Sequence, residues 1–200
     1  MYNIMEENLK SIFEASYQNP KDAKQTLENK GFKYDEELSS PDTKIFVDTL
    51  GNPHIAYRGS HRVEDVLTDI KLGLGYETKR HKDAKETAKK VEQKYGKAAS
   101  AYGTSLGGNL AESSGVSGYV YTYNKATGIK DIFKKIPKTQ FDYRTEKDII
   151  SLPSLLQKGG NKITIESSKK DNILKAHSTE SFDLSKKKKI QSGNPFIKFF

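Results

Sequence analysis

The stretch of sequence that decides the fold is AASAYGTSLGGNLAESSG, residues 98–115. Its first part, 98–103, is a run of small residues that predicts a strand, and a helix is predicted over 106–114. Between them stands the pattern Gly-x-Ser-x-Gly, which is typical of a serine held on a sharp strand-to-helix turn. Such a turn exposes the hydroxyl of Ser105 at the end of a sheet and directs the backbone amide of Leu106 toward the same point. The alternative for the pattern is an ordinary glycine-rich turn.

The rest of the chain alternates predicted strands and helices. Strands are predicted at 44–48, 54–57, 118–123, 140–144 and 162–167, and helices at 3–17, 20–31, 63–74 and 78–95. The first two strands flank a turn sequence at 50–53 and form a hairpin. This alternation implies an α/β fold of three layers, in which one sheet is flanked by helices. Because 200 residues suffice for one core but not for two average domains, we expect one compact domain over 1–200, with a helical N-terminal cap over 1–40.

Composition limits the chemistry and the partners. The chain has no cysteine, which excludes a disulfide framework, a thiolate metal site and a cysteine nucleophile. Its net charge of +8 predicts attraction to polyanions, either anionic membranes or nucleic acid. Only four of the 34 basic residues are arginine, whose fork suits base recognition, so specific nucleic-acid binding is not expected. No signal peptide and no run of roughly 18 apolar residues is evident, so we expect a soluble protein, cytoplasmic or particle-associated.

A serine nucleophile needs a histidine to take its proton and a carboxylate to orient that histidine. His177 follows the last predicted strand, in a loop that can reach the edge of the sheet. Of the other histidines, His54 lies on the predicted hairpin. His61 and His81 lie in charged helical surroundings, where solvent exposure is the simplest account. Asp148 follows the strand at 140–144 and precedes a proline-containing turn, although a helix cap or a solvated acid would also explain it. The order Ser105, Asp148, His177 is that of the α/β-hydrolases.

A second donor for an oxyanion is expected in the loop after an earlier strand. Residues 57–60 read Tyr-Arg-Gly-Ser and follow the strand at 54–57. Ser60 can donate from its backbone amide and from its hydroxyl, which would complement Leu106. Ser60 also fits the N-cap of the following helix, and the two roles are compatible.

Four separated blocks of the sequence resemble the class 3, or fungal-type, triacylglycerol lipases. The blocks are 55–60 with its continuation 64–69, then 102–111, 148–153 and 175–178, and together they span roughly 44–184. The resemblance implies an α/β-hydrolase that cleaves a lipid ester or another carboxylic ester through an acyl-enzyme. It also implies a triad of Ser105, Asp148 and His177, with oxyanion stabilisation by Ser60 and no need for a metal or cofactor.

The chain departs from this family at three positions. Thr104 stands where a histidine usually precedes the serine, and Tyr57 stands where phenylalanine is common. The segment 64–69 resembles the lid of that family, and Val66 stands where an aromatic residue often follows the acidic residue of the lid. The lid is expected as an amphipathic helix, and its apolar face consists of Val63, Val66, Leu67, Ile70 and Leu74. A less apolar lid argues against a preference for long-chain triglycerides and leaves phospholipids and other acyl esters open.

The C-terminal tail, 185–200, is basic and then aromatic. Its lysines and phenylalanines are Lys186, Lys187, Lys188, Lys189, Phe196, Phe199 and Phe200. This combination is typical of a peripheral contact with an anionic membrane, and its alternative is solvated lysines beside aromatic residues that fill the edge of the core. The main alternative for the whole chain is an inactive lipase-like fold that serves as a structural or binding protein for anionic membranes or nucleic acid.

Overall fold

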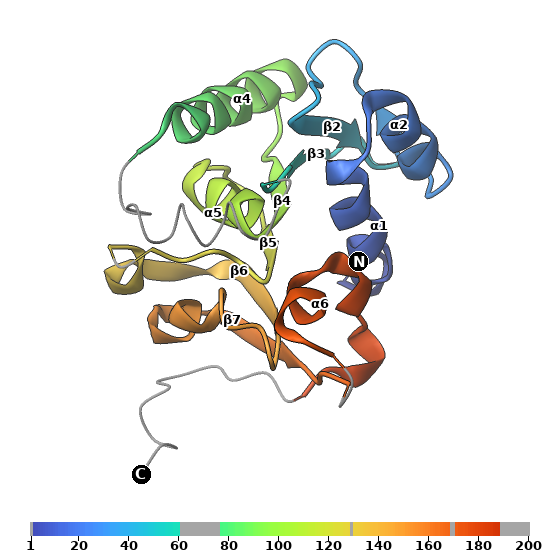
Figure 1. Ribbon diagram of the computed structural model, residues 1–200. Helices are drawn as coiled ribbons and strands as arrows, with labels where there is room; N and C mark the ends of the chain where they lie inside the picture. The colour runs from blue at the N-terminus through green and yellow to red at the C-terminus, as the bar shows by residue number, and fades with distance from the viewer. Residues whose placement is uncertain (1, 61–76, 129, 169–170, 189–200) are drawn as a thin grey trace.

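The computed structural model describes residues 2–60, 77–128, 130–168 and 171–188. Its centre is a seven-stranded sheet in which the strands are neighbours in chain order (Figure 1). The strands are β1 (Lys33–Tyr34), β2 (Thr43–Val47), β3 (Pro53–Tyr57), β4 (Ser100–Thr104), β5 (Val120–Tyr123), β6 (Lys135–Thr145) and β7 (Lys158–Ile165). β1, β2 and β3 pair antiparallel, and β3 to β7 pair parallel. The carboxyl ends of β3 to β7 therefore meet at one edge of the sheet.

Helices cover both faces of the sheet, which confirms the predicted α/β fold with flanking helices. The helices are α1 (Tyr2–Tyr17), α2 (Pro20–Glu28), α4 (Lys79–Tyr95), α5 (Leu106–Ser113) and α6 (Ile173–His177). Short 3-10 turns are η1 (Asp131–Phe133), η2 (Leu152–Leu156), η3 (Thr179–Ser181) and η4 (Leu184–Lys186). Figure 1 shows α1 and α2 on one side of the strands and α4 and α5 on the other. The two predicted N-terminal helices thus form one layer of the fold.

Each face of the sheet has its own apolar core, because successive strand residues point to opposite faces. Ala56 belongs to the core under α1, whereas its neighbour Ile55 belongs to the core under α4. The α1 side is aromatic: the rings of Tyr102 and Tyr121 stack with centroids 5.1 Å apart. The α4 side is filled by smaller residues, which lets the helices lie close to the sheet; they include Ala84, Ala88, Ala99, Ala101 and Ala111.

The C-terminal part of the described chain returns to α1. Phe13 of α1 meets Phe182, just beyond η3, edge to face with ring centroids 5.3 Å apart. Figure 1 shows α6 and its following turn beside α1, although they come from opposite ends of the sequence. The histidine segment is therefore anchored on the same layer that the N-terminal helices build.

Some elements differ from the sequence prediction. β1 was not predicted, because two residues carry no periodicity, and β6 starts at Lys135, ahead of a register shift between Ile136 and Phe141. The expected exposure of His81 is wrong, since its side chain is buried between α4 and α5. Its Nε2 lies 2.8 Å from Oδ1 of Asn109, and its Nδ1 lies 2.8 Å from Oγ1 of Thr78 at the start of α4.

Several predicted features lie outside the described residues. They are the apolar face of the lid (Val63, Val66, Leu67, Ile70 and Leu74) and the end of the tail (Lys189, Phe196, Phe199 and Phe200). Two tail lysines that are described pair with acids: Lys186 with Asp183 at 3.3 Å, and Lys188 with Glu146 at 3.1 Å. None of the helices in the described ranges combines the length and apolar content of a membrane span.

Candidate active site

Ser105 stands on a strained turn between β4 and α5. Its φ of 53° and ψ of −126° are uncommon for any residue with a side chain, and such strain is concentrated at functional sites. The turn needs the glycines around it: a Cβ on Gly103 would lie 2.1 Å from the carbonyl oxygen of Gly107. The side chain of Ser105 is buried, and its Oγ has no hydrogen-bond partner among the described residues.

Asp148 and His177 are in direct contact. Nδ1 of His177 lies 2.9 Å from Oδ1 of Asp148, and both residues are buried. The carboxylate also accepts hydrogen bonds from the backbone amides of Ile150 and Ser151, at 3.2 and 3.1 Å. The turn after β6 is tied back by Arg144, which donates to the carbonyl of Asp148 at 2.8 Å. These contacts fix the acid in one orientation.

The contact determines where the proton of the histidine sits. An ionised carboxylate can only accept hydrogen bonds, so Nδ1 of His177 carries the proton that it donates to Asp148. In the neutral imidazole the other nitrogen, Nε2, is then a free acceptor. Nε2 is buried and has no partner in the part of the chain that the structure describes. The arrangement leaves a buried acceptor nitrogen that no described group uses.

The loop after β5 joins the serine and the histidine segment. Because β4, β5 and β6 are parallel neighbours, the residues that follow them share one edge of the sheet. The backbone amide of Ala126 donates to the carbonyl of Ser105 at 3.0 Å, and the side-chain amide of Asn124 donates to the carbonyl of Ala176 at 2.8 Å. The structure therefore brings Asp148 and His177 into contact and places Ser105 at the same edge.

The loop that carries Ser60 lies against the turn of Ser105. A Cβ on Gly107 would lie 2.3 Å from the carbonyl oxygen of Tyr57, and one on Gly59 would lie 2.8 Å from the carbonyl oxygen of Thr104. On the other side, Arg80 of α4 donates to the carbonyl of Arg58 at 2.6 Å. The backbone amide of Leu106 begins α5, where the first amides have no acceptor within the helix. Amides are thus available at the place where the loop and the turn meet.

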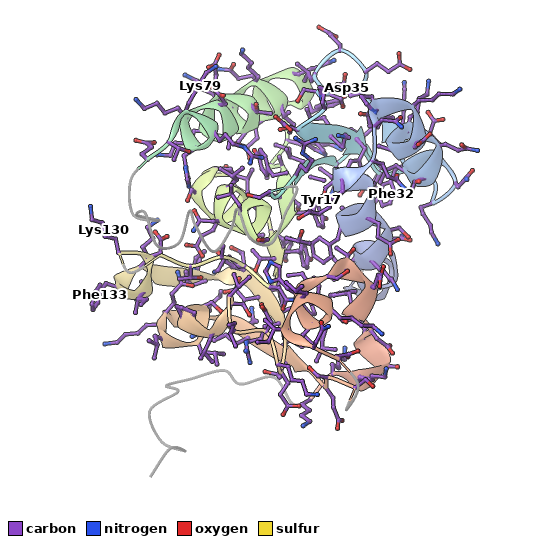
Figure 2. The ribbon with its side chains drawn as sticks, viewed as in Figure 1. Tyr17, Phe32, Asp35, Lys79, Lys130 and Phe133 are labelled. Carbon is purple, nitrogen blue, oxygen red and sulfur yellow. The ribbon has the colours of Figure 1, made fainter. Side chains whose placement is uncertain are left out.

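Sequence reasoning missed Tyr17, which links this loop to the turn. Its Oη lies 2.6 Å from Oγ1 of Thr104, and a Cβ on Gly59 would lie 2.3 Å from the same Oη, so the phenol lies directly against the loop. Burial raises the pKa of Tyr17, which keeps the phenol neutral. Figure 2 labels Tyr17 between α1 and the strands. No local pattern could reveal this contact, because the two side chains are 87 residues apart in the sequence.

Exposed apolar side chains flank the acid and the histidine in the sequence. Those beside Asp148 and those before His177 have exposed fractions between 47% and 53%: Ile149, Leu152, Ile173 and Leu174. Exposed apolar groups in the neighbourhood of a polar site suit a ligand that is itself partly apolar. Within the described ranges, His, Asp and Glu side chains form no group of three that could hold a metal ion.

The fold is that of the lipase-type α/β-hydrolases. Among solved structures, a deletion mutant of Rhizomucor miehei lipase in its propeptide complex is 12% identical, with a TM-score of 0.51 and coverage of 83% of this chain and 68% of that chain. A fungal lipase in an inhibitor complex is 18% identical, with a TM-score of 0.53 and coverage of 82% and 80%. The family model of the Tle-like phospholipase domain matches residues 5–150, and the chain belongs to this phospholipase-like family. A comparison with curated proteins finds no match.

Proposed function

We propose that the protein hydrolyses carboxylic esters of lipids, with Ser105 as nucleophile, His177 as general base and Asp148 as the acid that orients it. One observation carries this proposal. The Oγ of Ser105 and the Nε2 of His177 are both buried and both lack a hydrogen-bond partner among the described residues. Unpaired buried polar atoms are costly, and other described residues carry them too, among them His54. What supports the proposal is that these two belong to a serine on a strained turn and to a histidine paired with a carboxylate, at one edge of the sheet.

The reaction that we propose uses these three residues in turn. Nε2 of His177 takes the proton of Ser105 as Oγ attacks the ester carbonyl, and Asp148 stabilises the resulting imidazolium. The negative oxygen of the tetrahedral intermediate accepts hydrogen bonds from the backbone amide of Leu106 and from Ser60. The imidazolium then protonates the departing alcohol, which leaves an acyl-enzyme on Ser105. Water, deprotonated by His177, cleaves the acyl-enzyme and releases the carboxylic acid.

The substrate class that we propose is a phospholipid or a related acyl ester. The family to which the chain belongs is described as phospholipase-like, and its structural relatives are described as lipases. Exposed apolar residues that lie close to Asp148 and His177 in the sequence suit contact with an acyl chain. The net charge of +8 also favours approach to anionic lipid surfaces.

The test compares wild-type protein with Ser105→Ala on short-chain nitrophenyl esters and on phospholipid vesicles. The variant should lose at least about 10⁴-fold in kcat, since a triad without its nucleophile retains only the contribution of binding and the oxyanion site. Ser114→Ala is the matched control, because it removes another buried serine hydroxyl, one that bonds to Ala111 at the far end of α5. It should retain activity.

Two outcomes would contradict the proposal. Equal activity in the wild type and in Ser105→Ala would assign the hydrolysis to other groups. No activity of the folded wild-type protein on either substrate would favour an inactive lipase-like fold with a binding role.

A further inference from the structure

Asn124, the first residue after β5, has a conformation that few residues adopt. Its φ is 46°, in the left-handed region, and its side chain is fully buried. Asparagine tolerates this region better than most residues, but glycine adopts it without penalty. If the backbone bend were the only requirement, glycine would satisfy it. The buried amide of Asn124 therefore calls for a separate explanation.

The side chain of Asn124 bridges two segments of the proposed site. Its Oδ1 accepts a hydrogen bond from the backbone amide of Thr145 at 2.7 Å, at the end of β6. Its Nδ2 donates to the carbonyl of Ala176 at 2.8 Å and to Oγ1 of Thr145 at 3.3 Å. Thr145 leads to Asp148, and Ala176 directly precedes His177. One amide thus connects the strand that carries the acid to the segment that carries the histidine.

A neighbouring side chain completes the attachment. The hydroxyl of Tyr123 donates to the carbonyl of Ser178 at 3.3 Å and lies 2.5 Å from Oγ1 of Thr145. The carbonyls on both sides of His177 therefore accept hydrogen bonds from side chains at the end of β5. α6 has only five residues, and a helix this short has little stability of its own. The orientation of the imidazole depends on such attachments.

We propose that Asn124 is a positioning residue that holds His177 in register with Asp148, an inference that rests on the proposed hydrolysis. It does not touch the substrate. It fixes the Ala176 carbonyl against the end of β6, and so fixes the distance between Nδ1 of His177 and the Asp148 carboxylate. Misplacement of a catalytic group by about 1 Å reduces the rate by about 100-fold, so the effect is measurable in kcat.

The variant that tests this is Asn124→Gly, which permits the left-handed backbone and removes the side chain with its amide. We expect kcat for a short-chain nitrophenyl ester to fall between about tenfold and about 100-fold, with KM changed less than about twofold. The matched control is Asn161→Gly on β7. Asn161 also donates to backbone carbonyls, those of Lys138 and Gln140 at 2.7 and 3.1 Å, but along the strand rather than at the site edge. Its kcat should equal that of the wild type.

A second readout does not depend on turnover. The Nδ1 proton of His177, held in the hydrogen bond to Asp148, should give a strongly downfield proton NMR signal in the wild type and in Asn161→Gly. The signal should weaken or broaden in Asn124→Gly. If the wild type hydrolyses no ester, the proposed function fails, whereas the NMR comparison still decides the positioning role. Wild-type kcat together with an unchanged signal in Asn124→Gly would overturn that role.

If Asn124→Gly does not fold, hydrogen exchange in the wild-type protein tests the positioning role of Asn124. The side-chain amide protons of Asn124 should then exchange with solvent as slowly as the backbone amides of β6, because both are held in buried hydrogen bonds. Rapid exchange of these side-chain protons would show that the amide holds nothing, and it would overturn the proposal.

Discussion

A buried histidine outside the site links the stability of the fold to pH. His54 of β3 stacks on Phe46 with ring centroids 5.3 Å apart, and its Nδ1 lies 3.0 Å from the hydroxyl of Tyr102. Burial lowers the pKa of His54 to about 4. The Asp48 carboxylate, 3.6 Å from Nε2, acts in the opposite direction without overcoming the desolvation. The folded protein therefore keeps this side chain neutral.

We predict that acid destabilises the folded protein through His54. An unfolded histidine has a pKa of about 6.5. Between about pH 6.5 and about pH 4, His54 is therefore protonated in the unfolded chain but neutral in the folded protein. His54 should therefore not reduce the free energy of unfolding above about pH 6.5. Below that pH the free energy of unfolding should fall, by up to about 3 kcal/mol from this group. His54→Phe removes the titration but keeps the ring contacts. Urea unfolding at about pH 7.5 and about pH 5 should show that the free energy of unfolding decreases less for His54→Phe than for the wild type. Equal losses would assign the acid sensitivity to other groups.

The sequence indicated some site residues and missed others for a physical reason. Ser105 has a local pattern, and chain order then selects Asp148 and His177, which the structure brings into contact. Tyr17 and Asn124 act through side-chain contacts with residues far along the chain, and no spacing rule marks such residues. Asn124 carried one readable signal, since asparagine after a strand is compatible with a left-handed bend.

Between elements, α5 lies very close to the end of β3 and the loop that follows it. A Cβ on Gly107 would lie 2.3 Å from the carbonyl oxygen of Tyr57 and 2.9 Å from the backbone nitrogen of Gly59. Backbone atoms cannot turn aside as a flexible side chain can. The helix therefore sets the position of the loop that carries Ser60.

Gly107→Ala should separate these elements. We expect a loss of about 2–3 kcal/mol in the free energy of unfolding, together with a fall in esterase activity as the Ser60 loop moves away. The control is Gly96→Ala at the end of α4, where a Cβ meets nothing within 4 Å and only the positive φ of 62° is strained. That strain costs about 1 kcal/mol and leaves the site untouched. Denaturant unfolding and ester hydrolysis measure both effects, and equal stability of the two variants would contradict the tight approach.

The elements themselves were largely predictable. The hairpin of β2 and β3, the strand-turn-helix of β4 and α5, and the long α4 ending at Gly96 all follow from periodicity and glycine. β1 exists only because the edge of β2 is available to it, and the first part of β6 is held by β7 on both sides of a register shift. Such elements depend on tertiary pairing, which sequence periodicity does not show.

Across the whole molecule, lysine is not only a surface residue. Lys125 is buried with Glu112 and Asp142 at 2.5 and 3.1 Å, and it also donates to Gln157 at 2.9 Å. Burial alone would lower the pKa of Lys125, but the two carboxylates outweigh it and hold the pKa above its ordinary value. In so lysine-rich a sequence, nothing distinguishes this lysine from the solvated ones.

The net charge of +8 predicts that salt weakens the hydrolysis of anionic lipid. Hydrolysis of vesicles that contain anionic phospholipid should fall several-fold as salt rises from about 0.05 M to about 0.5 M, because salt screens the attraction between the protein and the surface. A soluble, uncharged short-chain ester serves as the control, and its hydrolysis should change little. If both substrates lose activity equally, salt acts on the protein itself and not on its approach to the lipid.

The strict order of the strands, β1 to β7, has a consequence for synthesis. Each new strand emerges beside a partner that has already been made, so the sheet can grow at a single edge while the chain is still on the ribosome. Ser105 is synthesised before Asp148 and His177. A nascent chain therefore holds a nucleophile without its base, and the hydrolytic activity that we propose arises only after the segment of His177 has left the ribosome and packed against β5 and α1.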